Sequence, residues 1–455
     1  MKFKSTITKY GIEHLLDKMY EDPDGTIPQL LNWADTFSGK DFKPQLRAVS
    51  DAALNPDHPY YPFIRSLFTD VDKEVLKKLM VNFFVNASLD GWKTQEVCRK
   101  KYGCNIPWAI LLDPTSACNL HCIGCWAAEY GNKLNLSYEE IDDIICQGKE
   151  LGVYMYIYTG GEPMVRKKDL IRLCEKHNDC VFLCFTNGTL IDETFADEML
   201  RVGNFVPAIS LEGFEEATDS RRGIGVYKDV IRAMKVLHEK KLIYGISACY
   251  TRANYESISS EEFYDSVIDN GASFIWYFHY MPVGNSANLD YLPTPEQREG
   301  MYRKIRRYRA TKPLFAMDFQ NDAEYVGGCI AGGRRYFHIN ANGDCDPCVF
   351  IHYSDSNIRS KTLLEVLQSP LFMQYHDNIP FSDNMLKPCP MLENSGKLVE
   401  MVRAAKAEST DLESPQDAEH LCGNTKKYAE NWNPFADRIW AENRAEKLEK
   451  EETHG

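Results

Sequence analysis

Six short apolar runs alternate with amphipathic segments between Trp108 and about Gly284, and this alternation limits the possible folds more than any other feature. A short apolar run followed by a segment with helical spacing predicts a strand-then-helix unit. Repeated units of this kind form a parallel sheet with right-handed crossovers. Six of them predict an α/β fold with a partial (β/α)6 barrel, since a closed barrel would need eight. The predicted strands are Ala109–Leu112, Val153–Tyr158, Val181–Phe185, Val206–Leu211, Ile243–Cys249 and Phe274–Tyr280.

The barrel is one of four predicted regions. Residues 1–105 form an N-terminal helical region, residues 106–320 the barrel, and residues 426–455 a charged helical tail that we expect to fray. Residues 321–425 have poor periodicity and clustered glycines, which favours a small domain organised by bound metal rather than by a large core. This region contains Cys329, Cys345, Cys348, Cys389 and Cys422.

The clearest helix of the N-terminal region is predicted from about Asp70 to Leu89. Its apolar residues recur with i, i+3, i+4 spacing and form a wide stripe. Two interpretations remain open: the stripe packs on the barrel, or it forms a surface for a lipid or protein partner. The residues of the stripe are Val75, Leu76, Leu79, Met80, Phe83, Phe84 and Ala87.

Composition narrows the function classes. The formal charge of −14 argues against nucleic acid as a partner or substrate. No apolar run approaches the roughly 18 residues of a membrane span, and the N-terminus lacks the apolar core of a signal peptide. Fifteen cysteines are too dilute for a small disulfide scaffold. We therefore expect a cytoplasmic protein with reduced thiols and no transmembrane segment.

Three cysteines directly after the first predicted strand are the strongest chemical signal. Cys118, Cys122 and Cys125 lie in one loop, separated by three and then two residues. Thiolates at such spacing select an iron–sulfur cluster or zinc. A structural zinc site usually takes four protein ligands, whereas three cysteines leave one iron of a [4Fe–4S] cluster open for a small chelating molecule. We favour the cluster, with zinc or three free thiols as the alternatives.

Polar residues also follow the other predicted strands. Gly160, Gly161 and Glu162 come after the second strand, and the glycine pair allows a ligand to approach the backbone closely. The third, fourth, fifth and sixth strands end in further polar groups. The active sites of parallel β/α barrels are built at this end of the strands. These groups include Thr186-Asn187-Gly188, Ser210-Leu211-Glu212, Arg252 with Asn254, and Gly284-Asn285.

Together, these motifs resemble those of the radical S-adenosylmethionine (radical SAM) superfamily over residues 108–285. The cysteine loop matches its CxxxCxxC motif, and Gly160-Gly161-Glu162-Pro163 matches its GGEP motif. The resemblance implies a [4Fe–4S] cluster that chelates S-adenosylmethionine, reductive cleavage to a 5′-deoxyadenosyl radical, and hydrogen abstraction from a substrate. It also implies an external low-potential electron donor of the flavodoxin or ferredoxin type. The implied cofactor contacts are Gly160, Gly161, Glu162, Asn187, Ser210, Glu212 and Arg222, and for Arg222 a surface salt bridge is an equal alternative.

The cysteines of residues 321–425 resemble the start of the auxiliary-cluster domains called SPASM and twitch. A full SPASM pattern carries seven cysteines, and fewer are present here, so we expect one auxiliary cluster. Zinc at this position is an alternative. The resemblance implies Cys329, Cys348 and Cys389 as ligands, with Cys345 or Cys422 as a fourth.

The substrate is the least constrained part of the prediction. We expect some of the aromatic residues on the second and sixth strands to line a substrate pocket. The SPASM resemblance favours modification of a peptide or protein side chain, with a lipid chain or small metabolite as the alternative. A non-catalytic iron–sulfur electron carrier is a third hypothesis, but a carrier needs no binding site for a sulfonium. The pocket candidates are Tyr156, Tyr158, Tyr277 and His279.

Overall fold

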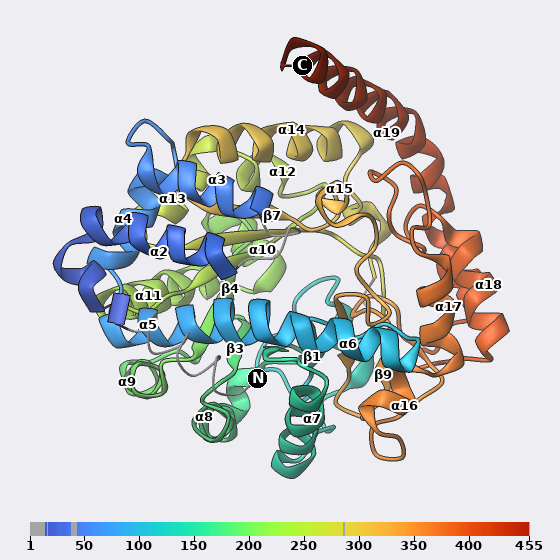
Figure 1. Ribbon diagram of the computed structural model, residues 1–455. Coiled ribbons are helices and arrows are strands. Elements are labelled where there is room, and N and C mark those ends of the chain that lie inside the picture. The colour runs from blue at the N-terminus through green and yellow to red at the C-terminus, as the bar shows by residue number, and fades with distance from the viewer. Residues whose placement is uncertain (1–13, 16, 38–42, 285–286, 455) are drawn as a thin grey trace.

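The computed structural model describes residues 14–15, 17–37, 43–284 and 287–454, and a single large sheet lies at its centre (Figure 1). The sheet has nine strands in the order β7-β6-β5-β4-β3-β2-β1-β8-β9. All neighbouring strands are parallel except β8 and β9, so the fold is the predicted open α/β barrel. The strands are β1 (Ala109–Leu112), β2 (Met155–Tyr158), β3 (Val181–Thr186), β4 (Phe205–Ser210), β5 (Gly245–Tyr250), β6 (Phe274–His279), β7 (Phe315–Asp318), β8 (Tyr336–Ile339) and β9 (Cys345–Asp346).

The six predicted strands are β1 to β6, each within two residues of its predicted bounds. Amphipathic helices connect them and bury their apolar faces against the sheet. The helix after β1 has the predicted capping box: the amide of Glu140 donates to Ser137 Oγ at 3.0 Å, and Glu140 Oε2 accepts from the amide of Ser137. These helices are α7 (Tyr138–Glu150), α8 (Lys167–Lys176), α9 (Glu193–Val202), α10 (Glu215–Arg222), α11 (Val226–Glu239), α13 (Glu261–Asp269) and α14 (Pro295–Thr311).

Strands β7 and β8 were not predicted, and they extend the sheet at both ends. β7 follows α14 and pairs with β6. β8 lies within the C-terminal region but pairs in parallel with β1, with Ala109 opposite Tyr336. The segment 321–425 therefore contributes a strand to the central sheet, and the four-region division of the chain stays a prediction.

The N-terminal region is helical where it is described, and one long helical ribbon runs from α5 to α6 (Figure 1). The middle of this ribbon is a π-helix, η2. The Asn82 side chain in η2 donates to the carbonyls of Asn178 and Cys180, both at 2.9 Å, just before β3. These contacts support the interpretation that the predicted stripe packs on the barrel, although Phe84 is half exposed. The helices are α2 (Pro23–Phe37), α3 (Lys43–Leu54), α4 (Tyr61–Thr69), α5 (Lys73–Met80), η2 (Val81–Gly91) and α6 (Trp92–Tyr102).

The C-terminal region packs beside the barrel and ends in the long helix α19 (Ala418–His454), which projects from the body in Figure 1. Trp432 and Ile439 are fully buried, and the Arg298 guanidinium lies 4.2 Å from the centre of the Trp432 ring. Up to Ile439 the helix is thus packed, contrary to the expectation that residues 426–455 fray. The shorter helices before it are α16 (Leu363–Leu367), α17 (Pro370–Asn378) and α18 (Ser395–Ala405).

Within the described residues, no helix has the length and apolar character needed to span a membrane.

Candidate active site

The loop that carries Cys118, Cys122 and Cys125 begins at the carboxyl end of β1. The glycine motif after β2 binds the start of this loop through main-chain hydrogen bonds. The amide of Gly161 donates to Thr115 O at 3.0 Å, and the amide of Glu162 donates to Ala117 O at 2.8 Å. A Cβ atom on Gly161 would lie 2.3 Å from Ala117 O, so no larger residue fits without displacing this backbone. The glycine is therefore required by the close approach of two loops.

Glu162 is 1% exposed and is held by three donors. Its Oε1 accepts from the amide of Met164 at 2.9 Å and from the Thr186 hydroxyl at 2.7 Å, and its Oε2 accepts from the amide of Asn187 at 2.7 Å. Burial raises the pKa of this carboxyl, and the three hydrogen bonds oppose that shift. A carboxylate has about four acceptor positions, so one remains for an ammonium group in the adjoining cavity.

Two arginines at the end of α10 hold the cysteine loop from the other side. The amide of Ile123 donates to Arg221 O at 2.9 Å, and Arg222 Nη1 lies 3.8 Å from Cys122 Sγ. Both guanidinium groups bind Glu212 Oε1, which is fully buried. Two cations against one carboxylate leave a net positive charge beside the cysteine loop, which suits a carboxylate ligand.

This geometry changes the role of Glu212. Unlike the other predicted cofactor contacts, it does not line the cavity, because it lies behind Arg221 and Arg222. We reassign it as a residue that positions the two arginines. Arg221 lines the cavity beside Arg222 and was not among the predicted contacts, although it directly precedes Arg222 in the sequence.

The three cysteines open onto a cavity of about 480 Å³ inside the barrel. Burial raises the pKa of Cys118 to about 11 and also raises that of Cys125, so these two thiols are protonated when free and a metal would have to displace their protons. The donor set of three thiols, one open acceptor position and a net positive charge fits a [4Fe–4S] cluster with S-adenosylmethionine. The predicted contacts that line this cavity are Gly160, Gly161, Glu162, Asn187, Ser210 and Arg222.

Of the four predicted pocket residues, only His279 lines the cavity. The Tyr156 hydroxyl donates to the carbonyls of Ile145 and Val153, and the Tyr158 ring stacks on Phe182 with centroids 5.6 Å apart. Tyr277 is fully buried as well and also lies outside the cavity lining. These three tyrosines are on the opposite face of their strands, so we reassign them to packing between the sheet and its helices.

His279 is held by hydrogen bonds to both ring nitrogens. Nδ1 donates to Tyr280 O at 2.6 Å, which leaves Nε2 to accept from the Tyr428 hydroxyl at 2.6 Å. Burial, with the nearby Arg298 charge, lowers the pKa of His279 well below its usual range. A neutral imidazole with both nitrogens occupied is a wall of the cavity and not a proton donor or acceptor for a ligand.

A second cavity of about 500 Å³ brings together Cys329, Cys348 and Cys389. The Tyr336 hydroxyl lies 2.9 Å from Cys348 Sγ, and the sulfurs of Cys348 and Cys389 accept from the amides of Phe350 and Leu392. Burial raises the pKa of Cys329 to about 12 and that of Cys348 to about 11. Buried thiols with backbone donors aimed at the sulfur suit an iron–sulfur cluster.

The two possible fourth ligands lie elsewhere. Cys345 is buried in β9, where its thiol donates to Gly343 O at 3.7 Å, and Cys422 is buried in α19. Neither lines the second cavity. The described residues therefore gather three cysteines, and not a fourth, at this position.

The two cavities share a wall of aromatic and apolar side chains. Sequence reasoning missed this wall, because its residues come from three strands, the helix α15 (Ala323–Val326) and several loops and carry no common motif. Trp276 neighbours Tyr277 on β6, and strand alternation places it on the opposite face, which is the face that lines the cavities. The shared lining residues are Trp276, Met281, Met317, Phe319, Val326, Ile330, Tyr336 and Phe350.

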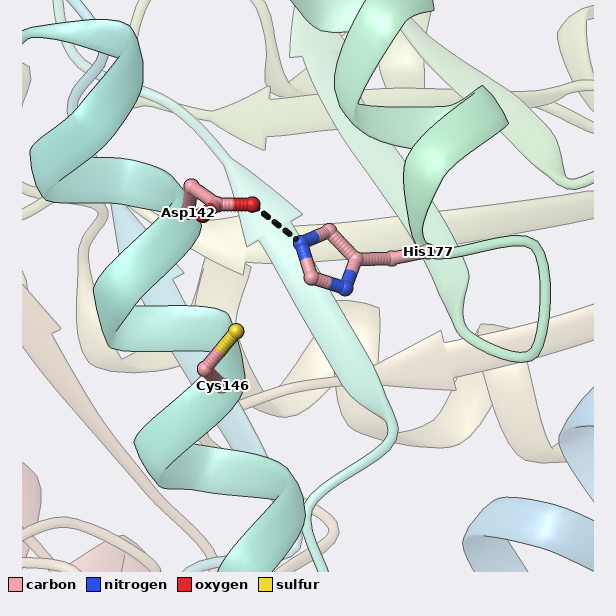
Figure 2. A group of neighbouring side chains, drawn as sticks. All are labelled: Asp142, Cys146 and His177. Atoms are coloured by element: carbon pink, nitrogen blue, oxygen red, sulfur yellow. Dashed lines mark hydrogen bonds and ion pairs between the residues drawn. The ribbon is translucent and has the colours of Figure 1, made fainter.

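A third group of ligand-type side chains lies on the outside of the barrel (Figure 2). Asp142 and Cys146 are one turn apart on α7, and His177 follows α8. Both oxygens of Asp142 are engaged, with Lys176 Nζ at 2.8 Å and His177 Nε2 at 2.9 Å. A metal ion would have to displace this ammonium group, so the arrangement is better explained as an ion pair between two helices.

Comparison with known proteins places these two sites in a family. Residues 112–259 match the radical SAM superfamily, and residues 329–391 match the SPASM iron–sulfur cluster-binding domain. The first match contains the cysteine loop and the glycine motif, and the second contains Cys329, Cys348 and Cys389.

Two curated relatives and one solved structure illustrate the range of the family. The chain is 27% identical over 209 residues to an Fe-coproporphyrin III synthase of Methanosarcina barkeri, which covers 44% of this chain and about half (51%) of that protein. It is 25% identical over 307 residues to a PqqA peptide cyclase of Gluconobacter oxydans, covering 63% of this chain and 83% of the cyclase.

The structure of Streptococcus suis SuiB bound to the precursor peptide SuiA superposes with a TM-score of 0.55 at 20% identity, over 74% of this chain and 80% of SuiB. This likeness concerns the fold alone. The radical SAM domain implies a [4Fe–4S] cluster and S-adenosylmethionine, and the SPASM domain implies further iron–sulfur ligation. Residues 112–259 therefore carry a radical SAM domain and residues 329–391 a SPASM domain, and together these two matches support an enzyme of the radical SAM type.

Proposed function

We propose that the chain is a radical SAM enzyme whose substrate occupies the space between the two cysteine sites. Cys118, Cys122 and Cys125 would hold the cluster that binds S-adenosylmethionine. Cys329, Cys348 and Cys389 would hold one auxiliary cluster. When bound, the first cluster and S-adenosylmethionine supply a carbon radical that removes a hydrogen atom from the substrate. The shared aromatic wall carries this proposal, since the same side chains line the cavity of each cysteine site and bring the two sites to neighbouring spaces.

The side chains of the first cavity have separate tasks in this proposal. Glu162 accepts from the methionine ammonium at its remaining acceptor position, and the net charge of Arg221 and Arg222 attracts the methionine carboxylate. Asn187 and Ser210 line the same cavity and supply polar atoms for the ribose. Phe185, Trp276 and Phe278 pack together with centroids 5.5–5.6 Å apart and give the cavity an apolar wall.

Two substrate classes are compatible with this site. A peptide or protein side chain is our first candidate, because the matched relatives include a PqqA peptide cyclase and the likeness to SuiB extends over most of the chain. A small, largely apolar metabolite is the second, and the enclosed aromatic lining of both cavities favours it. The relative named Fe-coproporphyrin III synthase supports this second class.

The proposal also names an electron donor, a cellular location and one excluded substrate class. Members of this superfamily typically need an electron donor, and we propose a flavodoxin- or ferredoxin-like protein in the cytoplasm. The charge of −14 makes nucleic acid an unfavourable substrate.

The proposal is tested with anaerobically reconstituted protein, S-adenosylmethionine and dithionite. We expect 5′-deoxyadenosine from the natural protein and none from Cys122→Ala. Cys184→Ala is the matched control, since this buried cysteine on β3 lies outside the cavity lining and its removal should leave the product unchanged. Product formation by Cys122→Ala, or its absence from natural protein that carries its full iron content and candidate substrate, would contradict the assignment.

A further inference from the structure

The arginines on the cavity walls differ in their partners. Four arginines line the two cavities: Arg221, Arg222, Arg309 and Arg335. Arg221 and Arg222 bind Glu212, and Arg309 binds Asp322. Within the part of the chain that the structure describes, the guanidinium of Arg335 has neither a hydrogen bond nor an ion pair.

Arg335 lies at the end of the cavity opposite the cysteine loop. Its carbonyl accepts from the amides of Trp108 and Ala109 at 2.7 and 2.9 Å, directly before β1 and β8 begin. The cysteine loop follows the other end of β1. At about 3.3 Å per residue, a strand of this length separates the two ends by roughly 13 Å. The walls between them are apolar and include Leu111, Ile157 and Phe319.

The charges around Arg335 favour an anion. Its guanidinium lies 4.7 Å from the centre of the Trp92 ring, and the guanidinium of Arg99 lies 4.6 Å from the same ring centre. Burial lowers the pKa of Arg335 to about 10, and the charges of Arg334 and Arg99 act in the same direction. Glu96 is the nearby carboxylate, and it is already bound by Arg99.

We propose that Arg335 binds a carboxylate of the substrate and fixes the substrate at the floor of the cavity. This inference rests on the proposed function and names the chemistry by which that site would recognise its substrate. The planar fork of a guanidinium matches a carboxylate with two parallel hydrogen bonds, and stacking on Trp92 holds its plane. The substrate would thus present an acidic group about one strand length from the atom that reacts.

In such an arrangement, the distance between the carboxylate and a given carbon of the substrate determines which carbon reacts. With the carboxylate held at Arg335, apolar groups of the substrate lie along the walls, and the reacting carbon is brought to the end that carries Cys118 and Glu162. The carboxylate could belong to a small apolar acid or to an acidic side chain of a peptide.

The test measures binding and needs neither S-adenosylmethionine nor reductant, so its outcome is independent of whether the chain cleaves S-adenosylmethionine. Equilibrium dialysis of the reconstituted protein would use two probes, phenyloctanoic acid and a blocked pentapeptide with one glutamate between phenylalanines. Each acid is paired with its neutral amide, the glutamine peptide in the second case.

We expect Arg335→Gln to weaken binding of one acid about tenfold or more, to leave its amide unchanged, and Arg335→Lys to restore part of the difference. The probe that responds identifies the source of the carboxylate. Arg172→Gln, an exposed arginine on α8, is the matched control and should change nothing. Equal affinities of the natural protein and Arg335→Gln for both acids, or an equal loss for acid and amide, would overturn the proposal.

Folding provides a second readout. Because Arg335 has two cationic neighbours and its carboxylate neighbour is already bound, Arg335→Gln should melt at or above the temperature of the natural protein. A lower melting temperature would assign this arginine a structural role instead.

Discussion

The two cysteine sites of this chain are assembled in different ways. Cys118, Cys122 and Cys125 lie in a single loop after β1, and their neighbours hold that loop through main-chain hydrogen bonds and a buried charge cluster. Cys329, Cys348 and Cys389 come from three separate segments that meet around one cavity. The first site is therefore local in sequence and supported from outside, whereas the second exists only where distant segments pack together.

This difference suggests that the sites can be disabled separately. Replacing Cys329, Cys348 and Cys389 together with alanine should remove about four iron atoms per chain and leave formation of 5′-deoxyadenosine intact. Iron analysis and the nucleoside assay measure the two effects. Cys345→Ala is the control, since its sulfur lies outside the cavity. Unchanged iron in the triple variant would contradict the auxiliary site.

The support of the first site is tested at Glu212. Glu212→Gln leaves two buried guanidinium groups without their shared carboxylate, and removing one partner of a buried ion pair costs about 3–5 kcal/mol. Chemical denaturation should show that loss, together with weaker binding of S-adenosylmethionine. Glu216→Gln, an exposed carboxylate on α10, should have little effect on either measurement. A stable Glu212→Gln protein with normal binding would mean that the arginines are held by other contacts.

A buried histidine links β8 of the C-terminal region to β1 of the barrel, and it makes the free energy of unfolding depend on pH. His338 on β8 lies 2.9 Å from Asp113, directly after β1, and 3.2 Å from Asp346 on β9. Burial alone would lower the pKa of His338, but the two carboxylates raise it to about 9. The folded state therefore binds this proton more tightly than the unfolded chain, whose histidine pKa is about 6.5.

The sign of the effect follows from this difference. The contribution of the protonated His338 to the free energy of unfolding is fully present below about pH 6.5. This contribution, about 3 kcal/mol at most, is lost as the pH rises through about 9. Denaturation curves between pH 6 and 10 should show the decline, and His338→Gln should flatten it. His238→Gln, on the surface helix α11, is the control. The same decline in His338→Gln would assign it to another group.

The smallest expected effect concerns the glycine motif. In Gly161→Ala, the new Cβ meets Ala117 O at 2.3 Å, so the two loops must separate, at a cost of about 1–3 kcal/mol. We expect lower thermal stability and weaker binding of S-adenosylmethionine. Gly396→Ala places its Cβ in open space on α18 and should be neutral. Equal melting temperatures of the two variants would contradict a steric role for Gly161.

The sequence predicts the local features of this molecule well. The strands β1 to β6 are visible because apolar runs of regular length alternate with amphipathic helices, and the Ser137 capping box marks a helix start without tertiary information. The radical SAM motif is contiguous, so its residues are recognised before their geometry is known. The radical SAM and SPASM domains, the fold and both cofactor types followed from these signals.

Features made by distant contacts were missed. β8 is only four residues long and is recognisable as a strand only from its pairing with β1. The sequence does not tell whether Tyr156, Tyr158 and Tyr277 point toward the helices or toward the cavity. Helices cover one side of these strands and a cavity lies on the other, so both faces are rich in apolar residues. Glu212 matched a contact position, but its burial behind two arginines depends on the fold of α10.

The pairing of β8 with β1 also bears on how the chain is made. β1 leaves the ribosome early, yet the strand that covers its outer edge begins at Tyr336, more than two hundred residues later. At about 5–20 residues per second, that edge waits roughly 10–45 s for its partner. An unpaired strand edge is a template for mispairing during that interval. A truncated chain that ends after the barrel would keep this edge exposed permanently, so the SPASM segment also completes the barrel as a folding unit.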